Sequence, residues 1–295
     1  MADLKLKDLR YLLAVADTGH FGRAAERCFV SQPTLSAQLK KLEQYLGVQL
    51  LERAPRRVTL TEAGVAIATR ARQIATASDE IVEIARSFRD PLAGRLRVAF
   101  LPTIGPYLLP QAAPRLRRAL PRLELMLYEY QTAEILRRLH AGELDLGILA
   151  LPVDLDGLSA RKLYDEPFTV ALPAGHPLAK RGTLNVGDLK HETLLLLEDG
   201  HCLRDQALEI CNRVPIREKT DFRGTSIETL RQMVAAGAGI TLLPQRAAAS
   251  SVRGVVIKEF ARPMPVRHVG AVWRKTTARA AAIAAVCEQL QQTAA

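Results

Sequence analysis

The sequence predicts an α/β protein that carries a helical N-terminal domain and a long connecting helix. Three observations support this fold class. Residues 1–60 contain three short amphipathic segments and a hairpin pattern, apolar residues then recur at every seventh position, and strand and helix patterns alternate from Arg95 onward. Strands that alternate with helices are typical of parallel α/β architecture. A chain of 295 residues is long enough for two domains or more.

The first domain is predicted over residues 1–60 from helix start and stop signals. Segment 21–30 places Ala24, Ala25 and Cys28 on one face, and after a short turn Ser31 caps a second helix that stops at Gly47. Two short apolar stretches around "APR" predict a β-wing. This is the helix-turn-helix plan, whose second helix enters the major groove of DNA.

The candidate DNA contacts lie at the exposed start of the second helix and on the wing. Hydroxyl, amide and guanidinium groups suit base edges and phosphates. The candidates are Ser31, Gln32, Pro33, Thr34, Ser36, Gln38, Arg53, Arg56 and Arg57. Taken singly, each also fits an ordinary solvated surface.

A long helix is predicted over residues 61–90. It begins at a capping box, Thr59 to Glu62, and ends at Pro91. Leu60, Ile67, Ile74, Ile81 and Phe88 follow one another at intervals of seven. A strict seven-residue repeat favours pairing with another helix, and we expect dimerisation here. The alternative is an amphipathic helix that lies on its own domain.

Residues 91–295 are predicted to form two α/β lobes with a cleft between them. About 200 residues is large for one such sheet, and ligands of open sheets bind at the carboxyl ends of strands. We expect lobe I over residues 91–163 and 267–295, and lobe II over residues 164–266.

Composition excludes several classes of protein. No apolar run is long enough to span a membrane and the charged start is unlike a signal peptide, so we expect a cytoplasmic protein without membrane contact. The net charge is +10, but residues 1–90 hold 14 basic and 11 acidic side chains, which leaves only +3 there. The positive charge is therefore not concentrated in the predicted DNA-binding domain. Phosphate-binding, zinc-protease and serine-hydrolase motifs are absent, and we expect no enzyme, cofactor or metal.

Two of the four cysteines, Cys202 and Cys211, flank a predicted helix over Leu203–Ile210. Nine helical steps of about 1.5 Å would separate them by ~13 Å. A disulfide needs Cα atoms within about 7 Å. The spacing alone leaves two readings open: thiols that never meet, or a pair that joins only when the helix unwinds. Cys28 and Cys287 lie on apolar helix faces and are expected to be inert.

The stretch "FGRAAERCFVSQPTLSAQLKKLEQYLGVQLLER", with "RVTLTEAG" after it, resembles the winged helix-turn-helix of the LysR-type transcriptional regulators. The resemblance covers the whole chain and implies a two-lobed regulatory domain similar to periplasmic binding proteins. Within the family, "LPTIGPYLLP", "GHCLRDQ" and "TSIETLRQMVAAGAGITLLP" resemble the members that sense hydrogen peroxide.

This resemblance implies roles for particular residues. Cys202 would react with peroxide and Cys211 would resolve the product as a reversible disulfide. The residues implied to bind peroxide are Thr103, Thr132, His201, Asp205 and Arg274. A structural helix cap is the alternative for both threonines.

The resemblance also implies partners: double-stranded promoter DNA, RNA polymerase, a cellular thiol reductant of the glutathione or glutaredoxin type, and the chain itself in a homotetramer built as a dimer of dimers. The expected function is an activator of oxidative-stress defence genes. Two alternatives remain: a LysR-type regulator that senses a small organic ligand in the cleft, with incidental cysteines, and a thiol peroxidase or oxidoreductase.

Overall fold

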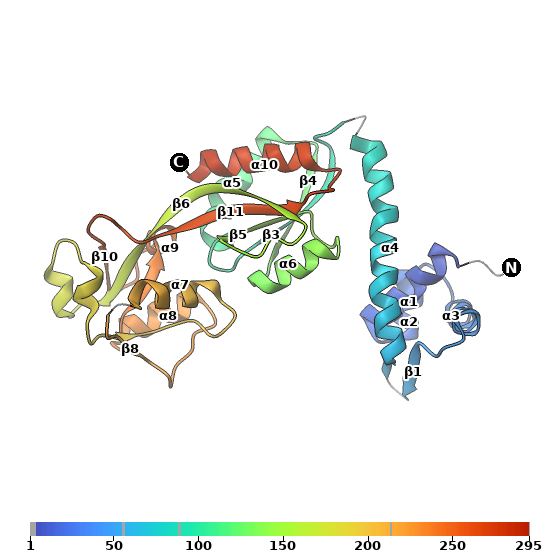
Figure 1. Cartoon of the computed structure of the whole chain (residues 1–295), viewed down its shortest axis with the longest axis horizontal. Helices are drawn as coiled ribbons and strands as arrows, with labels where there is room; N and C mark the ends of the chain where they lie inside the picture. The colour runs from blue at the N-terminus through green and yellow to red at the C-terminus, as the bar shows by residue number, and fades with distance from the viewer. Residues whose placement is uncertain (1–3, 55–56, 88–89, 213, 295) are drawn as a thin grey trace. The chain divides into compact units, whose positions relative to one another are not determined.

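The computed structural model describes residues 4–54, 57–87, 90–212 and 214–294. The chain divides into two compact units, Met1–Ala85 and Arg86–Ala295, with the boundary near the end of the long helix (Figure 1). In the described part of the chain, no helix is long and apolar enough to cross a membrane.

The first unit is a three-helix domain with a hairpin, which confirms the prediction from the helix signals. Its elements are α1 (Leu6–Thr18), α2 (Phe21–Arg27), α3 (Gln32–Leu46), and the antiparallel strands β1 (Leu51–Ala54) and β2 (Arg57–Leu60). Leucines at helical spacing fill the core, among them Leu12 of α1 with Leu35 and Leu39 of α3. The short turn between α2 and α3 leaves the start of α3 on the surface.

The long helix α4 (Glu62–Ser87) is continuous over 26 residues. Its first half packs on the first unit, because Ala68 and Ala71 are buried in that core. Further along, Ile74 is 47% exposed and Ile81 is 68% exposed. Phe88, the last residue of the predicted repeat, lies outside the described residues. The first half of α4 therefore packs against its own unit, whereas the side chains of Ile74 and Ile81 are exposed.

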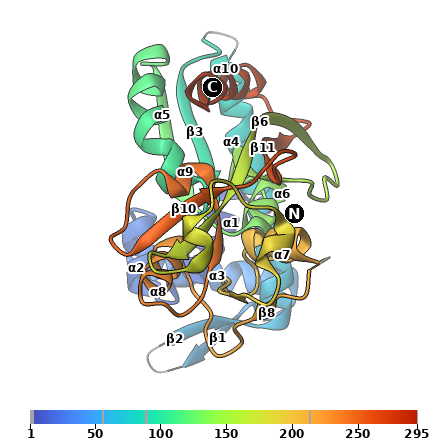
Figure 2. The same cartoon turned by 90° about the vertical axis from the view of Figure 1, so that its left-hand side faces the viewer.

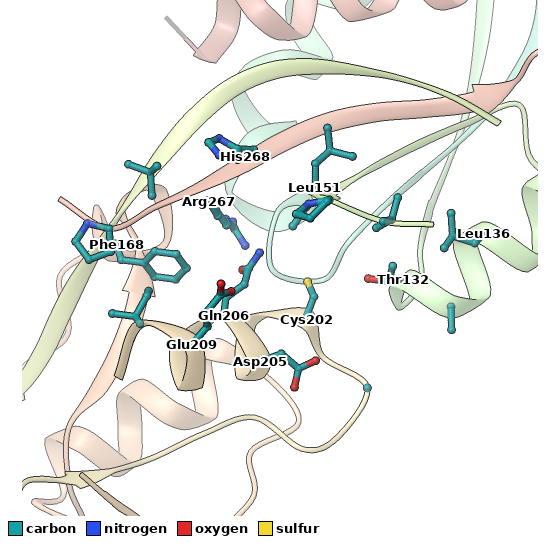
Figure 3. Close-up of a pocket in the computed structure, with 18 residues that line it drawn as sticks. Thr132, Leu136, Leu151, Phe168, Cys202, Asp205, Gln206, Glu209, Arg267 and His268 are labelled. Atoms are coloured by element: carbon teal, nitrogen blue, oxygen red, sulfur yellow. The ribbon is translucent and has the colours of Figure 1, made fainter. Parts of the chain in front are cut away.

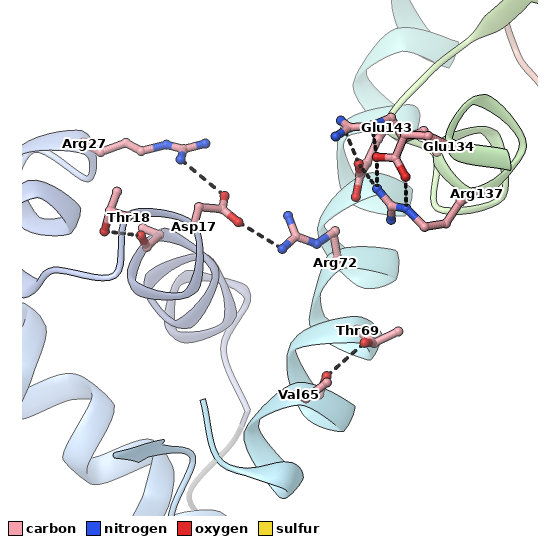
Figure 4. A network of polar contacts seen from close by, with 11 residues as sticks. Asp17, Thr18, Arg27, Val65, Thr69, Arg72, Glu134, Arg137 and Glu143 are labelled. Carbon is pink, nitrogen blue, oxygen red and sulfur yellow. Dashed lines mark hydrogen bonds and ion pairs between the residues drawn. The ribbon is translucent and has the colours of Figure 1, made fainter. Parts of the chain in front are cut away.

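Ion pairs also fasten α4 to the other helices of its unit. Asp17 accepts hydrogen bonds from Arg72 of α4 at 3.0 Å and from Arg27 at 3.3 Å (Figure 4). Arg10 pairs with Asp79 at 2.8 Å. Pairs of this exposure contribute about 0–1 kcal/mol each, so the buried alanines stabilise the contact more than the charges do.

The second unit is built on a seven-stranded sheet formed by the described residues, in the order β10-β6-β11-β5-β3-β4, with β9 paired to β6. The strands are β3 (Gly94–Phe100), β4 (Leu123–Glu129), β5 (Leu146–Leu151), β6 (Leu158–Pro173), β9 (Thr241–Pro244), β10 (Val255–Glu259) and β11 (Val266–Arg274). β3 is parallel to β4 and β5, whereas β11 is antiparallel to β5 and β6. The expectation of parallel strands holds only for the first three, because β6 and β11 return along the sheet instead of crossing over.

Helices cover this sheet on both faces and divide its apolar side chains between two cores. α5 (Gly105–Ala119) and α10 (Ala280–Ala294) pack together on one side, and α6 (Thr132–His140) lies on the other (Figures 1 and 2). The first core contains Leu163 of β6 and Val269 of β11. The second contains Phe168, also of β6, with side chains of α7 (Cys202–Cys211), α8 (Ile227–Ala235) and α9 (Gln245–Ala248). The long strand β6 thus joins the two cores.

The predicted helix between the two cysteines is confirmed and includes both of them. α7 begins at Cys202 and ends at Cys211. Leu203, Ala207 and Cys211 are its buried residues and pack in the second core. Before α7, the apolar segment "TLLLL" forms the strand β7 only at Thr193–Leu194, which pairs with β8 (Arg217–Glu218).

Candidate functional site

A cavity of about 790 Å³ lies where the two cores of the second unit meet (Figure 3). Side chains of α6, the end of β5, α7 and the start of β11 line it. They include Thr132, Leu136, Leu151, Phe168, Cys202, Asp205, Gln206, Glu209, Arg267 and His268. The cavity is therefore apolar along much of its wall and carries both acidic and basic groups.

Cys202 is the nucleophilic side chain in this cavity. Burial raises the pKa of its thiol, while Arg267 and the hydroxyl of Thr132 lower it. Asp205, one turn further along the helix, raises the pKa as well. Burial outweighs the start of the helix, where the dipole alone favours a thiolate. The guanidinium of Arg267 is thus the main group that opposes protonation of Cys202.

Cys211 occupies the other end of the same helix and faces away from the cavity, into the second core. Burial raises the pKa of its thiol to about 11. Both cysteines are free thiols. At about 1.5 Å per residue, the intact α7 holds them ~13 Å apart, far beyond disulfide distance.

Two polar atoms of the cavity wall are buried without a hydrogen-bond partner among the described residues: Thr132 Oγ1 and Gln206 Oε1. The Thr132 hydroxyl and the Cys202 sulfur point toward one another in Figure 3, close enough to lower the thiol pKa without forming a hydrogen bond of ordinary geometry. A buried polar atom without a partner costs about 1–3 kcal/mol. Such atoms beside a thiol indicate a place for a small molecule that donates hydrogen bonds.

Arg267 is held in place from both sides of the junction. Its side chain is 1% exposed and pairs with Glu166, 3% exposed, at 2.7 Å. Its guanidinium also donates to Thr103, to Oγ1 at 3.1 Å and to the carbonyl oxygen at 2.9 Å. Thr103 is buried and does not line the cavity; it orients the arginine that does.

His201 and Asp205 lie close to Cys202 along the chain but in different environments. His201 is buried, with Nε2 at 3.2 Å from Gln131 Nε2 and 3.7 Å from the Glu198 carboxylate. It precedes α7 without capping it. Asp205 is exposed and lines the cavity. Of the two, only Asp205 lines the cavity.

The charged residues around α7 bind one another rather than the thiol. The Asp199 carboxylate pairs with Arg204 at 3.1 Å. Arg204 also pairs with Glu218 at 2.9 Å. Arg204 is therefore engaged away from Cys202.

The structure does not bring Arg274 to the cavity. Its guanidinium donates to the carbonyl oxygens of Leu139 and Leu144, both at 2.8 Å. Arg274 ends β11, whereas Arg267 lies near its start, and seven strand residues span about 23 Å. The arginine beside Cys202 is Arg267, which the sequence analysis missed. An arginine among the apolar residues of a strand was the available signal.

The predicted DNA contacts are only partly free to bind. Ser31, Gln32, Pro33 and Thr34 are exposed at the start of α3, and Ser31 Oγ caps the helix by accepting from the Thr34 amide at 3.3 Å. Gln38 instead donates to Asp8 at 3.0 Å and ties α3 to α1.

The other four residues of that set are Ser36 of α3 and three arginines of the wing. Ser36 is half-buried. Arg56 and the side chains of Arg53 and Arg57 lie outside the described residues, so the wing contacts stay predictions. Within the described ranges, no group of three or more His, Cys, Asp or Glu side chains could hold a metal ion.

Family models match both units of the chain. Residues 6–65 match the bacterial regulatory helix-turn-helix protein, lysR family, and residues 89–295 match the LysR substrate binding domain. The chain therefore belongs to the LysR family. This is a family of transcriptional regulators rather than enzymes.

Comparison with individual relatives shows which members of the family the chain is similar to. The chain is 46% identical to the hydrogen peroxide-inducible genes activator of Dickeya chrysanthemi, over 92% of this chain and 90% of that one. It is similar to the solved structure of full-length OxyR from Pseudomonas aeruginosa, with a TM-score of 0.79, 39% identity and 98% of each chain covered. A mutant OxyR of Corynebacterium glutamicum with H₂O₂ bound gives a TM-score of 0.69 at 34% identity, over 99% of this chain and 93% of that one.

Proposed function

We propose that this chain is a transcription activator that senses hydrogen peroxide through Cys202 and reports it to promoter DNA. The observation that carries the proposal is the position of two free thiols at opposite ends of one helix, with Cys202 in a cavity beside Arg267 and beside two buried polar atoms that have no partner among the described residues. Relatives that cover most of the chain bear the name of peroxide-inducible activators.

The first chemical step is attack of the Cys202 thiolate on one oxygen of hydrogen peroxide. The O–O bond breaks, the attacked oxygen stays on sulfur as a sulfenic acid, and the other oxygen leaves as hydroxide and takes up a proton. Thr132 and Gln206 hold the peroxide by accepting its hydrogen bonds. Arg267 favours the thiolate, Thr103 orients Arg267, and Asp205 assists the leaving hydroxide.

The second step joins the cysteines. The Cys211 thiol attacks the Cys202 sulfur and expels the hydroxyl as water, which leaves a disulfide. Since an intact α7 keeps the two sulfurs apart, this step needs the helix to unwind. Unwinding removes Leu203, Ala207 and Cys211 from the second core, and that core must repack. The helix is thus a bistable element that sulfur chemistry biases.

The repacked lobe acts on DNA through the assembly. Ile74 and Ile81 on α4 supply an exposed apolar seam for pairing with a second copy, and the functional unit is a homotetramer that binds a promoter with the start of α3 and the wing. A changed spacing of the readers then recruits RNA polymerase, and a glutathione- or glutaredoxin-type thiol returns the protein to its reduced form. In this proposal, residues 1–60 bind DNA, residues 61–90 form the contact between subunits, and residues 91–295 react with peroxide.

Cysteine variants test the proposal. Wild-type, Cys202→Ser, Cys211→Ser and the control Cys287→Ser proteins are treated with graded peroxide and their thiols are assigned by mass spectrometry. We expect the intramolecular disulfide in the wild-type and control proteins, a trapped sulfenic acid in Cys211→Ser, and no reaction at this site in Cys202→Ser. DNA footprints should change only where the disulfide forms. A Cys202→Ser protein that still changes its footprint with peroxide would refute the role of this thiol.

A second candidate function rests on the size of the cavity. About 790 Å³ exceeds what a two-oxygen molecule fills, and Leu136, Leu151 and Phe168 give it an apolar wall. Cavities of this size and lining bind organic ligands. A Cys202→Ser/Cys211→Ser protein whose melting temperature rises with a small organic ligand, and whose footprint changes with it, would favour this function over peroxide sensing.

A further inference from the structure

Phe29, in the turn between α2 and α3, combines two unfavourable features. Its side chain is 96% exposed, and its backbone has a φ of 55°, in the left-handed region. A bulky residue other than glycine rarely adopts this conformation, because its Cβ crowds the neighbouring carbonyl oxygen. Backbone strain of this kind persists at sites where function requires the side chain.

The turn itself does not require a phenylalanine. The Val30 amide donates to the Ala25 carbonyl at 3.0 Å, and the Phe29 amide donates to the Glu26 carbonyl at 3.1 Å. This is the Schellman arrangement, in which glycine usually takes the left-handed position. The two neighbouring helices follow that rule: α1 ends at Gly19 with φ 61°, and α3 ends at Gly47 with φ 70°.

Packing does not require it either. The apolar contact that accompanies a Schellman turn comes from Val30, which packs against the core of the first unit. Phe29 contributes nothing to that core, so its ring is available only to a partner outside the chain.

The position of Phe29 identifies the partner. It lies two residues before the cap Ser31 and three before Gln32, within about 10 Å of the exposed helix start along the chain. In a helix-turn-helix domain that start faces base edges in the major groove. The apolar group that bases present there is the C5-methyl of thymine, and phenylalanine is among the side chains that contact it.

We infer that Phe29 reads a thymine methyl group at the edge of the site bound by α3. This inference rests on the proposed DNA-reading function and adds a specificity residue to it. The wild-type protein provides the probe: a DNA duplex selected by that protein from a random pool, together with copies in which each thymine in turn is replaced by deoxyuridine, which lacks only the methyl group.

The test compares wild-type protein with Phe29→Asn and Phe29→Leu. Asparagine tolerates the left-handed conformation, so Phe29→Asn should melt at the same temperature as wild type or higher. Its affinity for the selected duplex should nevertheless fall about five- to tenfold, as expected for one lost base contact. One deoxyuridine position should weaken wild-type binding by a similar factor, weaken Phe29→Leu less, and leave Phe29→Asn unaffected.

Tyr45→Asn is the matched control, because Tyr45 is an exposed aromatic residue near the other end of α3. It should bind every duplex as wild type does. Equal affinity of wild type and Phe29→Asn would overturn the inference, and so would a loss that is the same with and without every methyl group. Unchanged DNA binding with reduced transcription by RNA polymerase would also overturn it, in favour of a polymerase contact. Failure of the wild-type protein to select any DNA would instead count against the proposed function.

Discussion

The helices α3 and α7 are built in opposite ways at their ends. α3 begins with a side-chain cap from Ser31 and ends at Gly47 in the left-handed conformation. α7 begins after His201, which makes no side-chain cap, and is followed by Asn212 in the right-handed conformation, with no basic residue in the last turn of the helix. A good cap contributes about 1 kcal/mol. The proposed DNA-reading helix α3 needs one conformation, whereas the proposed switch helix α7 needs two of similar free energy, and the helix ends differ accordingly.

Proline substitution should give the largest difference in effect between α3 and α7. Proline inside a helix costs about 3 kcal/mol or more. Ala37→Pro in α3 should unfold the first unit and abolish DNA binding. Glu209→Pro in α7 should leave DNA binding intact and shift the thiol–disulfide equilibrium toward the disulfide. Equilibration in glutathione buffers measures the thiol–disulfide equilibrium, and footprinting measures DNA binding. An unchanged redox equilibrium in Glu209→Pro would mean that the helix is not the barrier.

Alkaline pH should weaken both cores of the second unit next, because each contains one buried cysteine whose pKa is raised. Burial raises the pKa of Cys211 and of Cys287 to about 11. An unfolded thiol titrates near about 8.5, so above that pH the unfolded chain releases protons that the folded chain retains. The stabilisation is complete below about pH 8.5 and disappears as the pH rises through about 11, by up to about 3 kcal/mol for each thiol.

Urea unfolding of reduced protein at pH 7, 9 and 10.5 measures this loss. Between pH 7 and 10.5, the free energy of unfolding should fall less in Cys211→Ala than in wild type. In the exposed control Gln44→Ala it should fall as much as in wild type. Identical pH dependence in wild type and Cys211→Ala would contradict the assigned pKa shift.

Removal of the cap of α3 should have a smaller effect. Ser31→Ala leaves the Thr34 amide without its acceptor and should lower the free energy of unfolding of the first unit by about 1 kcal/mol. The midpoint of chemical unfolding should fall, while the redox equilibrium of the cysteines should stay the same. Ser31→Asp, which retains a capping oxygen, should keep the stability; if it loses as much as Ser31→Ala, the cap is not what stabilises α3.

The smallest effect is expected from a charge at the end of α7. Glu209→Lys exchanges an acidic for a basic side chain near the negative end of the helix dipole, worth about 0.5–1 kcal/mol. The lysine should stabilise the helical, reduced form, so that the thiol–disulfide equilibrium shifts two- to fivefold toward free thiols. Gln44→Lys in the last turn of α3 is the matched change and should leave that equilibrium where it was. A shift of equal size in both variants would exclude a local effect.

Sequence patterns predicted what depends on near neighbours. α7, the turn between α2 and α3, and the cap Ser31 all follow from residues within one or two helical turns. Arg267 could not be found this way, because Glu166 and Thr103, which hold it, are 101 and 164 residues away. The resemblance implied Arg274 for the site, but Arg274 lies at the other end of the same strand. Likewise, the antiparallel return of β11 beside β6 depends on pairing across about a hundred residues.

In the proposed mechanism, the weak ends of α7 also affect how long the disulfide persists. Any free energy that the helix regains on refolding makes the disulfide easier to reduce, by about 30 mV of potential for each 1.4 kcal/mol. A helix with strong caps would return to the thiol form soon after peroxide disappears, and a helix with none would stay oxidised. If the proposed switch operates, the helix ends at His201 and Asn212 would therefore influence the duration of the response, separately from the chemistry that starts it.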